Sequence, residues 1–214
     1  MSKPRNPNLE DAYSVKTPED NKELYSSWSA SYDSGFAMGR GYIYPQQIAK
    51  QYSQIAQQDD GPILDVGAGT GLVAEALLKN CSRPIDAIDI SKEMLDAAAA
   101  KKVYQRLILA DLSQTIPIED GVYGAVVSAG TFTHGHVGPS AINELLRIAK
   151  PGALFCLGIN GTAFDKYGFG SAFARLSSEE LIESLRFSQV QYYEKAEDEH
   201  ADDRGYVAIF RKPA

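Results

Sequence analysis

A strand-like run followed by a glycine-rich turn is the most informative stretch of this sequence. It reads ILDVGAGTG over residues 63–71 and continues into the helical run LVAEALLKN. Glycines let a ligand approach the backbone and let the chain turn sharply, and the free N–H groups of a first helical turn favour an anionic group. We therefore expect a nucleotide-like ligand above this turn, at the carboxyl ends of parallel strands.

The spacing of the glycines narrows the choice of ligand. Gly67, Gly69 and Gly71 form the pattern G-x-G-x-G, whereas a dinucleotide pyrophosphate is bound by G-x-G-x-x-G. Asp65, which precedes the turn, would repel a pyrophosphate but can help to hold an ammonium group. S-Adenosylmethionine carries an ammonium and a carboxylate and no phosphate, so this cofactor fits the pattern better than NAD does.

The next strand also ends in an acid. Asp89 closes the run PIDAID, about as far downstream of the glycines as a ribose-binding acid lies after a glycine loop. A carboxylate there can accept hydrogen bonds from both ribose hydroxyls. Two alternatives stay open: Asp89 could only cap the helix that begins at Ser91, and Asp86, two residues earlier on the strand, is a rival for the same role.

A third acid follows the third strand. Asp111 stands in LILADL, where its carboxylate can accept a hydrogen bond from the exocyclic amine of adenine. Met94 and Leu112 are apolar neighbours suited to the adenine ring. Three consecutive strands that each finish in an Asp above one loop are a more specific signal than any one of these motifs alone.

The fourth strand leads into a segment with two histidines, His134 and His136. Methyl transfer from a sulfonium needs mainly alignment and desolvation, and a base is required only where the nucleophile must lose a proton. Either histidine could be that base; alternatively, one binds a loop carbonyl and the other faces solvent. We expect no metal site, because H-x-H lacks a third ligand and His200 lies in a distant acidic stretch.

The methyl acceptor is expected near the same end of the sheet. Thr133 lies beside the histidines, and the segment LGINGTAFDKYGFG adds Asn160, Asp165 and Tyr167, which we expect to line the acceptor pocket as a lid with glycine hinges. The modest polarity of these residues favours a small-molecule acceptor.

Composition limits the partners. The 214 residues carry a net charge of −7, so clustered cations for a phosphate backbone are lacking and nucleic acid is not an expected partner. Cys81 and Cys156 are too isolated for a disulfide framework or zinc site. No apolar run is long enough to span a membrane and the N-terminus lacks an apolar leader. A cytoplasmic monomer or homodimer is the expectation.

Short apolar runs alternate with helical stretches from residue 62 onward, which is typical of βαβ units. The sequence predicts an α/β, doubly wound, Rossmann-like fold: a mostly parallel seven-stranded sheet with helices on both faces and an antiparallel C-terminal hairpin. The expected strands are residues 62–66, 84–89, 105–109, 122–128, 152–159, 188–196 and 205–211. The expected helices are residues 18–32, 44–57, 71–80, 91–102, 139–149 and 177–186.

These elements imply one domain over residues 19–214, preceded by a flexible arm over residues 1–18. Within the domain we expect a helical cap at 19–58, a cofactor-binding core at 62–160, and a lid helix with the C-terminal hairpin at 161–214.

Together, these motifs resemble the class I S-adenosylmethionine-dependent methyltransferases. ILDVGAGTG is similar to the family's first motif, IDAIDIS with KEML to its second, LILADL to its third, and LLRIAKPGALFCLGIN to the helix, turn and fifth strand that follow. More narrowly, LYSSWSASYD with VYQRLILADL and AINELLRIAKPGAL resembles the methyltransferase-like proteins named from the Williams-Beuren region, and their bacterial relatives.

The resemblance implies a methyltransferase that binds S-adenosylmethionine, with a non-catalytic binding protein and an NAD-dependent oxidoreductase as alternatives. It places Gly67, Ala68 and Gly69 at the methionine part, Asp89 and Ile90 at the ribose, and Asp111 and Leu112 at the adenine. An aromatic cap over the cofactor and the end of the fourth strand complete the implied site, through Tyr25, Trp28, Tyr32, Ser128, Ala129 and Gly130. Trp28 could equally be a core residue.

Overall fold

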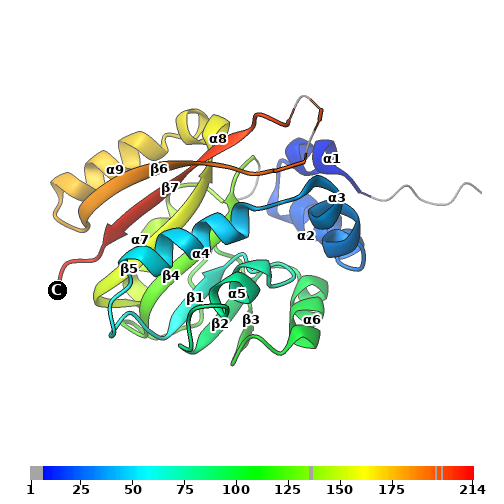
Figure 1. Ribbon diagram of the computed structural model, residues 1–214. Coiled ribbons are helices and arrows are strands. Elements are labelled where there is room, and N and C mark those ends of the chain that lie inside the picture. Colours follow the sequence, from blue (N-terminus) through cyan, green and yellow to red (C-terminus); the bar gives the residue numbers. More distant parts are fainter. Residues whose placement is uncertain (1–6, 135–136, 196, 199) are drawn as a thin grey trace, which may run out of the picture.

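A seven-stranded sheet in the order β3-β2-β1-β4-β5-β7-β6 runs through the protein (Figure 1). The computed structural model describes residues 7–134, 137–195, 197–198 and 200–214. β1 to β5 are parallel, and β7 is antiparallel to both β5 and β6, as the sequence predicts. The strands are β1 (Ile63–Val66), β2 (Ile85–Asp89), β3 (Leu107–Leu109), β4 (Tyr123–Phe132), β5 (Ala149–Asn160), β6 (Glu183–Gln191) and β7 (Arg204–Arg211).

Helices cover both faces of this sheet because the central strands are buried on both sides. Ile63 and Val127 pack with α4 and α5, whereas Leu64 and Phe155 pack with α7 and α9. This alternation follows from side chains pointing to opposite faces along a strand. The helices are α1 (Leu9–Ser14), α2 (Pro18–Trp28), α3 (Met38–Arg40), α4 (Tyr44–Ile55), α5 (Leu72–Leu77), α6 (Lys92–Lys101), α7 (Ala141–Ile148), α8 (Gly161–Lys166) and α9 (Phe169–Ser178), with a π-helical segment at Tyr32–Ala37.

The helix expected at residues 177–186 is wrong. Helix α9 ends at Ser178, and Glu180 and Ser184 have left-handed backbone conformations, with φ of 54° and 55°. Residues 183–191 instead form β6, which pairs along β7. The stretch SSEELIESL has good helical propensity, but pairing with the neighbouring strand decides its structure.

The flexible arm expected at residues 1–18 is also wrong in part. Helix α1 lies within it and is closed by a capping box, in which the Asn8 side chain accepts from the backbone of Asp11 and the Asp11 side chain accepts from that of Asn8. Leu9 and Ala12 are buried. The weak apolar period of this stretch hid a short helix whose stability comes from its cap and its packing.

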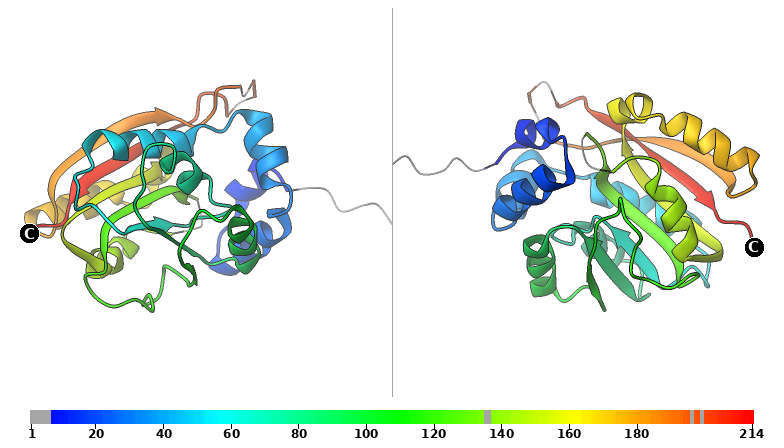
Figure 2. Two further views of the ribbon diagram at one scale, coloured as in Figure 1. Left: turned by 60° about the horizontal axis from the view of Figure 1, so that its bottom comes forward. Right: turned by 180° about the vertical axis from the view of Figure 1, so that it is seen from behind.

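The N-terminal helices lie beside the carboxyl ends of the central strands, and each view of the molecule shows the helices and these strand ends together (Figure 2). Helix α2 begins with Thr17 as its N-cap and Pro18 in its first turn, which suits Pro because that N–H needs no helical partner. Consequently α1, α2 and the π-helical segment form a wall over the end of the sheet where the sequence places the site.

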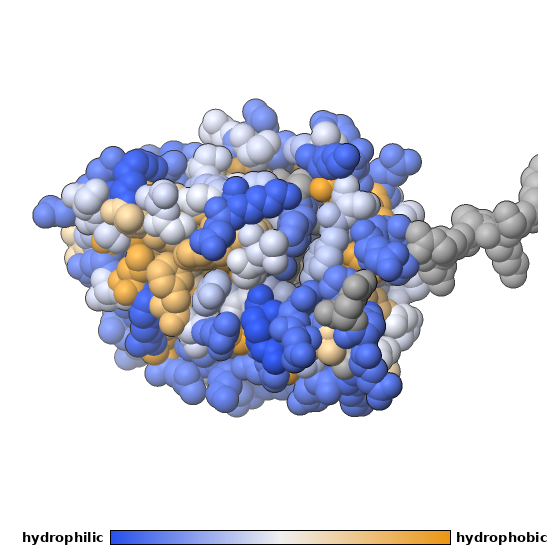
Figure 3. Space-filling view, turned by 90° about the horizontal axis from the view of Figure 1, so that it is seen from above, coloured by the Kyte–Doolittle hydropathy of each residue, from blue (hydrophilic) through white to orange (hydrophobic). Residues whose placement is uncertain are grey.

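Hydrophilic residues cover most of the face seen in Figure 3, and its largest hydrophobic patch lies toward the α9 end. Within the described residues, no helix is both long and apolar enough to cross a membrane. Cys81 and Cys156 are buried, free thiols.

Candidate functional site

The glycine turn joins β1 to α5 in a strained backbone that only glycine adopts easily. Gly67, Gly69 and Gly71 have φ of 63°, 54° and 94°. A Cβ on Gly67 would lie 2.0 Å from Oγ1 of Thr131, so no side chain fits there. A Cβ on Gly69 would meet no atom within 4 Å, which shows that the turn presents bare backbone to open space.

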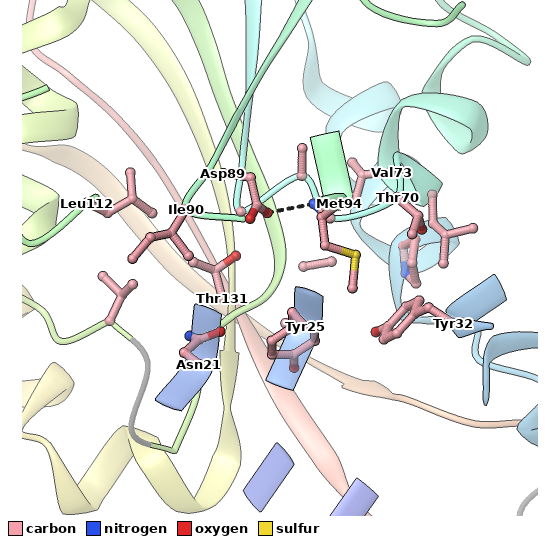
Figure 4. A pocket seen from close by; sticks show the side chains of 18 of the residues that line it. Asn21, Tyr25, Tyr32, Thr70, Val73, Asp89, Ile90, Met94, Leu112 and Thr131 are labelled. Atoms are coloured by element: carbon pink, nitrogen blue, oxygen red, sulfur yellow. Dashed lines mark hydrogen bonds between the residues drawn. The ribbon is translucent and has the colours of Figure 1, made fainter. Parts of the chain in front are cut away.

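Asp89 ties this turn to the end of β2. Its carboxylate accepts hydrogen bonds from the backbone N–H of Gly69 and of Ser91, both at 2.8 Å. Burial raises the pKa of Asp89, and the backbone N–H donors of Ser91 and Gly69 act in the opposite direction. The carboxylate still points into the cavity above the turn (Figure 4), so it can both shape the turn and bind a ligand.

Above the turn lies a first cavity of about 880 Å³, whose far wall is helix α2. Asn21 and Tyr25 of α2 face Asp89 across it (Figure 4). The structure brings most of the sequence-predicted cofactor residues together here: Tyr25, Tyr32, Gly67, Ala68, Gly69, Asp89, Ile90, Met94, Asp111, Leu112, Ala129 and Gly130. Their roles in binding stay predictions, but one cavity now contains them.

Asp65, Gly71 and Ser128, which were expected to bind the cofactor, do not line the first cavity. The side chain of Asp65 accepts a hydrogen bond of 2.6 Å from the Tyr104 hydroxyl, and Gly71 also faces Tyr104, so neither lines the first cavity. The Ser128 hydroxyl is buried and donates to the carbonyl of Val66 at 2.7 Å. The sequence pattern finds the strand ends correctly, but it does not show which way each side chain points.

Asp65 is nevertheless an unusual group. It is fully buried, and its Oδ1 is among the buried polar atoms that have no hydrogen-bond partner. Burial raises the pKa of this carboxyl to about 7, while the Tyr104 hydrogen bond lowers it. Asp65 therefore lies beneath the glycine turn rather than in the ligand space.

A second cavity, of about 530 Å³, adjoins the first. Tyr25, Tyr32, Tyr42 and Gly130 line both cavities, and a Cβ on Gly130 would lie 3.2 Å from the Tyr42 hydroxyl oxygen. The remaining wall contains Trp28 and the expected substrate residues Thr133 and Asn160, together with Leu9, Ala12, Tyr13, Phe36, Tyr44, Tyr192 and Tyr193. Trp28 is thus on this second cavity rather than on the first.

His134 lies behind the second cavity and does not line it. Its Nδ1 is 3.4 Å from Oγ1 of Thr133, which does line it, and its ring centroid is 5.0 Å from that of Tyr13. Burial, with the charge of Lys166, lowers the pKa of His134, which keeps the ring neutral at neutral pH. His136 lies outside the described residues.

The lid residues are only partly at the site. Asn160 lines the second cavity and caps α8, its side chain accepting from the Ala163 backbone at 3.0 Å. Asp165 is exposed on α8, and Tyr167 packs against the core cluster under α7 and α9; neither lines either cavity. The expected acceptor role of Asp165 and Tyr167 therefore has no geometric support.

Several wall residues were not predicted from sequence. Tyr42 and Tyr193 pair as an isolated β-bridge, and the backbone N–H of Ile43 donates to the carbonyl of Tyr192 at 2.8 Å. This contact joins two tyrosine-rich stretches that lie about 150 positions apart in the sequence. The high tyrosine content of both stretches is visible in the sequence, but their contact in the fold could not be predicted from it. Asn21 and Thr70 of the first cavity were also missed.

The first cavity fits S-adenosylmethionine. Bare backbone at Gly69 leaves room for the amino-acid part, the Asp89 carboxylate can accept from ribose hydroxyls, and Ile90, Met94 and Leu112 offer apolar surface to adenine. Asn21 and Tyr25, from α2, close the opposite side. Among the described residues, no group of three or more His, Cys, Asp or Glu side chains is arranged to hold a metal ion.

Comparisons with known proteins match this chain to methyltransferases. Residues 64–157 match the family model described as a methyltransferase domain. The chain is 36% identical over 140 residues to methyltransferase-like protein 27 of Homo sapiens. This alignment covers 63% of this chain and 55% of that protein. The chain spans between half and two thirds of the length of this and another curated relative.

Two solved structures share the fold. A putative S-adenosyl-L-methionine-dependent methyltransferase from Methanococcus maripaludis has a TM-score of 0.62 at 20% identity and covers 100% of this chain and 98% of that one. The [4+2]-cyclase SpnF has a TM-score of 0.70 at 17% identity, covering 94% and 98%. At these identities the likeness shows the fold, and the second example shows that this fold also occurs in a cyclase.

Proposed function

The chain belongs to the class I S-adenosylmethionine-dependent methyltransferases, and from this premise we propose that it transfers the methyl group of that cofactor to a small-molecule acceptor. The observation that carries the proposal is the pair of adjoining cavities, which share Tyr25, Tyr32, Tyr42 and Gly130. A donor in the first cavity and an acceptor in the second would meet at these residues.

The chemistry needs alignment more than it needs acid or base groups. Bound S-adenosylmethionine supplies an electrophilic methyl carbon on a sulfonium, and the sulfur keeps the electron pair of the broken bond. The residues that line both cavities would hold the acceptor atom in line with the bond that breaks. The aromatic side chains around the second cavity exclude water from the reacting atoms.

A proton must also leave if the acceptor atom carries one. We assign its path to Thr133 and His134: the acceptor proton passes to the Thr133 hydroxyl, whose own proton passes to Nδ1 of His134 when that nitrogen is unprotonated. The 3.4 Å separation of Thr133 Oγ1 and His134 Nδ1 supports this relay, and the lowered pKa of His134 keeps its ring able to accept a proton at neutral pH.

The first test is the cofactor itself. Calorimetric titration with S-adenosylmethionine and, in parallel, NAD should show binding of the former alone, and Asp89→Ala should weaken that binding at least tenfold. Asp96→Ala, which removes an exposed carboxylate on α6, is the matched control and should bind like the wild type. Binding of NAD in place of S-adenosylmethionine would contradict the proposal.

A second candidate is a protein that binds S-adenosylmethionine without transferring its methyl group. The likeness of the fold to a [4+2]-cyclase favours keeping this candidate. A screen of small-molecule acceptors with S-adenosylhomocysteine as the measured product separates the two. Product formation that depends on the acceptor supports methyl transfer. The second candidate is favoured if the cofactor binds, some acceptors also bind, and none of these acceptors yields product.

A further inference from the structure

The walls of the second cavity are dominated by aromatic rings. Nine of the fourteen residues that line it are Tyr, Trp or Phe. The ring of Phe36 lies near the centre of this group, with its centroid 5.0 Å from that of Trp28, 5.1 Å from Tyr32, 5.4 Å from Tyr42 and 6.2 Å from Tyr193. These separations are typical of edge-to-face and tilted aromatic pairs, so a flat ring placed among them would find similar partners.

The same walls carry no full charge. None of the described residues that line the second cavity is Asp, Glu, Lys or Arg. Burial raises the pKa of Tyr25, Tyr32, Tyr42 and Tyr44 above the ordinary value for a phenol, so their hydroxyls stay neutral at neutral pH. An anionic acceptor would therefore lose its hydration without gaining a counterion, which is costly.

Arg40 occupies one of the aromatic faces that a cationic acceptor would need. The guanidinium carbon of Arg40 lies 4.7 Å from the centroid of the Tyr193 ring, so one aromatic face already holds a positive charge. The nearby carboxylate of Asp203 accepts from the Tyr13 hydroxyl at 2.8 Å and lies 3.0 Å from Nδ1 of His200. Asp203 is thus engaged outside the cavity and does not face into it.

Polar groups that can orient a neutral ligand remain in the wall. Thr133 and Asn160 lie on the side of β4 and β5, and the Tyr42 hydroxyl lies against Gly130, where the two cavities meet. A hydroxyl or amino group on an aromatic ligand can pair with these side chains while its ring packs among the tyrosines.

We propose that the second cavity is an acceptor site for an uncharged, flat aromatic molecule that carries a hydroxyl or amino group, such as a phenol or an aromatic amine. This proposal rests on the proposed methyl transfer and specifies its acceptor. For a phenol, the oxygen forms the bond to the methyl carbon as the carbon–sulfur bond breaks, and the phenolic proton leaves by Thr133 and His134.

Binding of four small probes to the full-length protein tests this class without requiring turnover. The probes are p-cresol, p-toluate as its anionic counterpart, trimethylphenylammonium as a cation, and 4-methylcyclohexanol as a neutral molecule without an aromatic ring. Calorimetry measures affinity. Fluorescence reports the site, because Trp28, the single tryptophan of the sequence, lines this cavity.

The expected result is that p-cresol binds and changes the fluorescence of Trp28, while each of the other three probes binds at least fivefold more weakly. Phe36→Leu should weaken p-cresol binding about fivefold, in the range of a lost aromatic pair. The matched control is Phe187→Leu, since Phe187 is 43% exposed on β6 and lines neither cavity; it should bind p-cresol like the wild type.

Binding of p-toluate or trimethylphenylammonium that equals or exceeds that of p-cresol would overturn the proposal, and this comparison in the wild type needs no variant to fold. Equal affinity of p-cresol for wild type and folded Phe36→Leu would overturn it as well. Failure of methyl transfer is recognised separately: S-adenosylmethionine then fails to bind or yields no product, whatever the order of probe affinities.

Discussion

The backbone N–H of Gly69 donates a hydrogen bond of 2.8 Å to the carboxylate of Asp89, twenty positions later in the sequence. This bond fastens the glycine turn after β1 to the end of β2, and it holds Gly69 where its open side faces the first cavity. Asp89 therefore acts before any ligand arrives, by fixing the conformation of the backbone that the ligand meets. Such preorganisation lowers the cost of ordering a loop upon binding.

Two glycines of the turn should respond differently to the same substitution. Gly67→Ala places a Cβ 2.0 Å from Thr131 Oγ1 and strains a backbone with φ of 63°, whereas Gly69→Ala meets only the strain of φ 54°. We expect a loss of about 1 to 2 kcal/mol in unfolding free energy for Gly69→Ala and a clearly larger loss for Gly67→Ala. Urea titrations of both variants check this order; equal losses would contradict it.

The alternation of strands and helices and the position of the glycine turn could be predicted because they depend on local patterns. Strands that end in Asp65, Asp89 and Asp111 were found by short apolar runs, and the alternation of strands and helices fixed their parallel pairing. The direction of the side chains could not be predicted in the same way. Asp65 lies beneath the turn because its position on β1 directs it toward Tyr104, a partner 39 positions away.

The acceptor wall was harder to predict because it is assembled from distant segments. Tyr13 from α1, Phe36 from the π-helical segment and Tyr193 after β6 meet only in the folded chain. Helix α1 was not expected, and the strand expected at residues 188–196 instead runs from Glu183 to Gln191, so that Tyr193 follows it. Pairing between β6 and β7, rather than local propensity, places Tyr193 at the site.

Asp65 should make the stability of the protein depend on pH. Its pKa is about 7 in the folded protein and about 4 in an unfolded chain. Between these values the folded state binds more protons, so this group's contribution to the unfolding free energy is fully present below pH 4 and is lost as the pH rises to 7. Asp65→Asn cannot lose a proton and should lack this decline.

The measurement is the difference in unfolding free energy between Asp65→Asn and the wild type, from denaturant titrations between pH 4 and 8. As the pH rises from 4 to 7, the unfolding free energy of the wild type should fall relative to that of Asp65→Asn by up to a few kcal/mol, at about 1.4 kcal/mol per pKa unit. Above pH 7 the difference between the two proteins should stay constant. A constant cost from the buried amide does not affect this slope. Asp165→Asn, at an exposed site on α8, serves as the control; a flat difference for Asp65→Asn refutes the prediction.

The proton relay predicts a pH dependence of turnover. The pKa of His134 is lowered from its ordinary value of 6.5, so the ring becomes protonated, and unable to accept a proton, only at pH values below that. With p-cresol as acceptor, turnover should rise as the pH increases through this lowered pKa and then level off. His134→Gln should reduce turnover about a hundredfold and remove this rise.

Two histidine variants are the controls for this experiment. His200→Gln changes a ring that contacts Asp203 rather than Thr133 and should keep the pH profile of the wild type. His136→Gln tests the other sequence-predicted base. If His134→Gln retains full turnover at every pH, the proposed proton relay is wrong. If only His136→Gln loses the rise of turnover with pH, His136 is the base instead.

Helix α1 should depend on a single hydrogen bond for its closure over the second cavity. The Tyr13 hydroxyl donates to Asp203 at 2.8 Å, and this bond links α1 to the segment just before β7, 190 positions away. Leu9, Ala12 and Tyr13 line the cavity from α1, so a loosened helix should weaken acceptor binding. Tyr13→Phe removes the hydroxyl and keeps the ring; a bond to a carboxylate contributes about 1.5 to 3 kcal/mol.

We expect the amides of α1 to exchange hydrogen at least several-fold faster in Tyr13→Phe, and p-cresol to bind several-fold more weakly. The affinity for S-adenosylmethionine should change less than twofold, because Tyr13 does not line the first cavity. Tyr167→Phe, whose ring lies outside both cavities, should change none of these quantities. Unchanged exchange in α1 would show that Leu9 and Ala12, both buried, hold the helix without the hydrogen bond. Faster exchange of the α1 amides with unchanged p-cresol affinity would show that helix α1 does not contribute to acceptor binding.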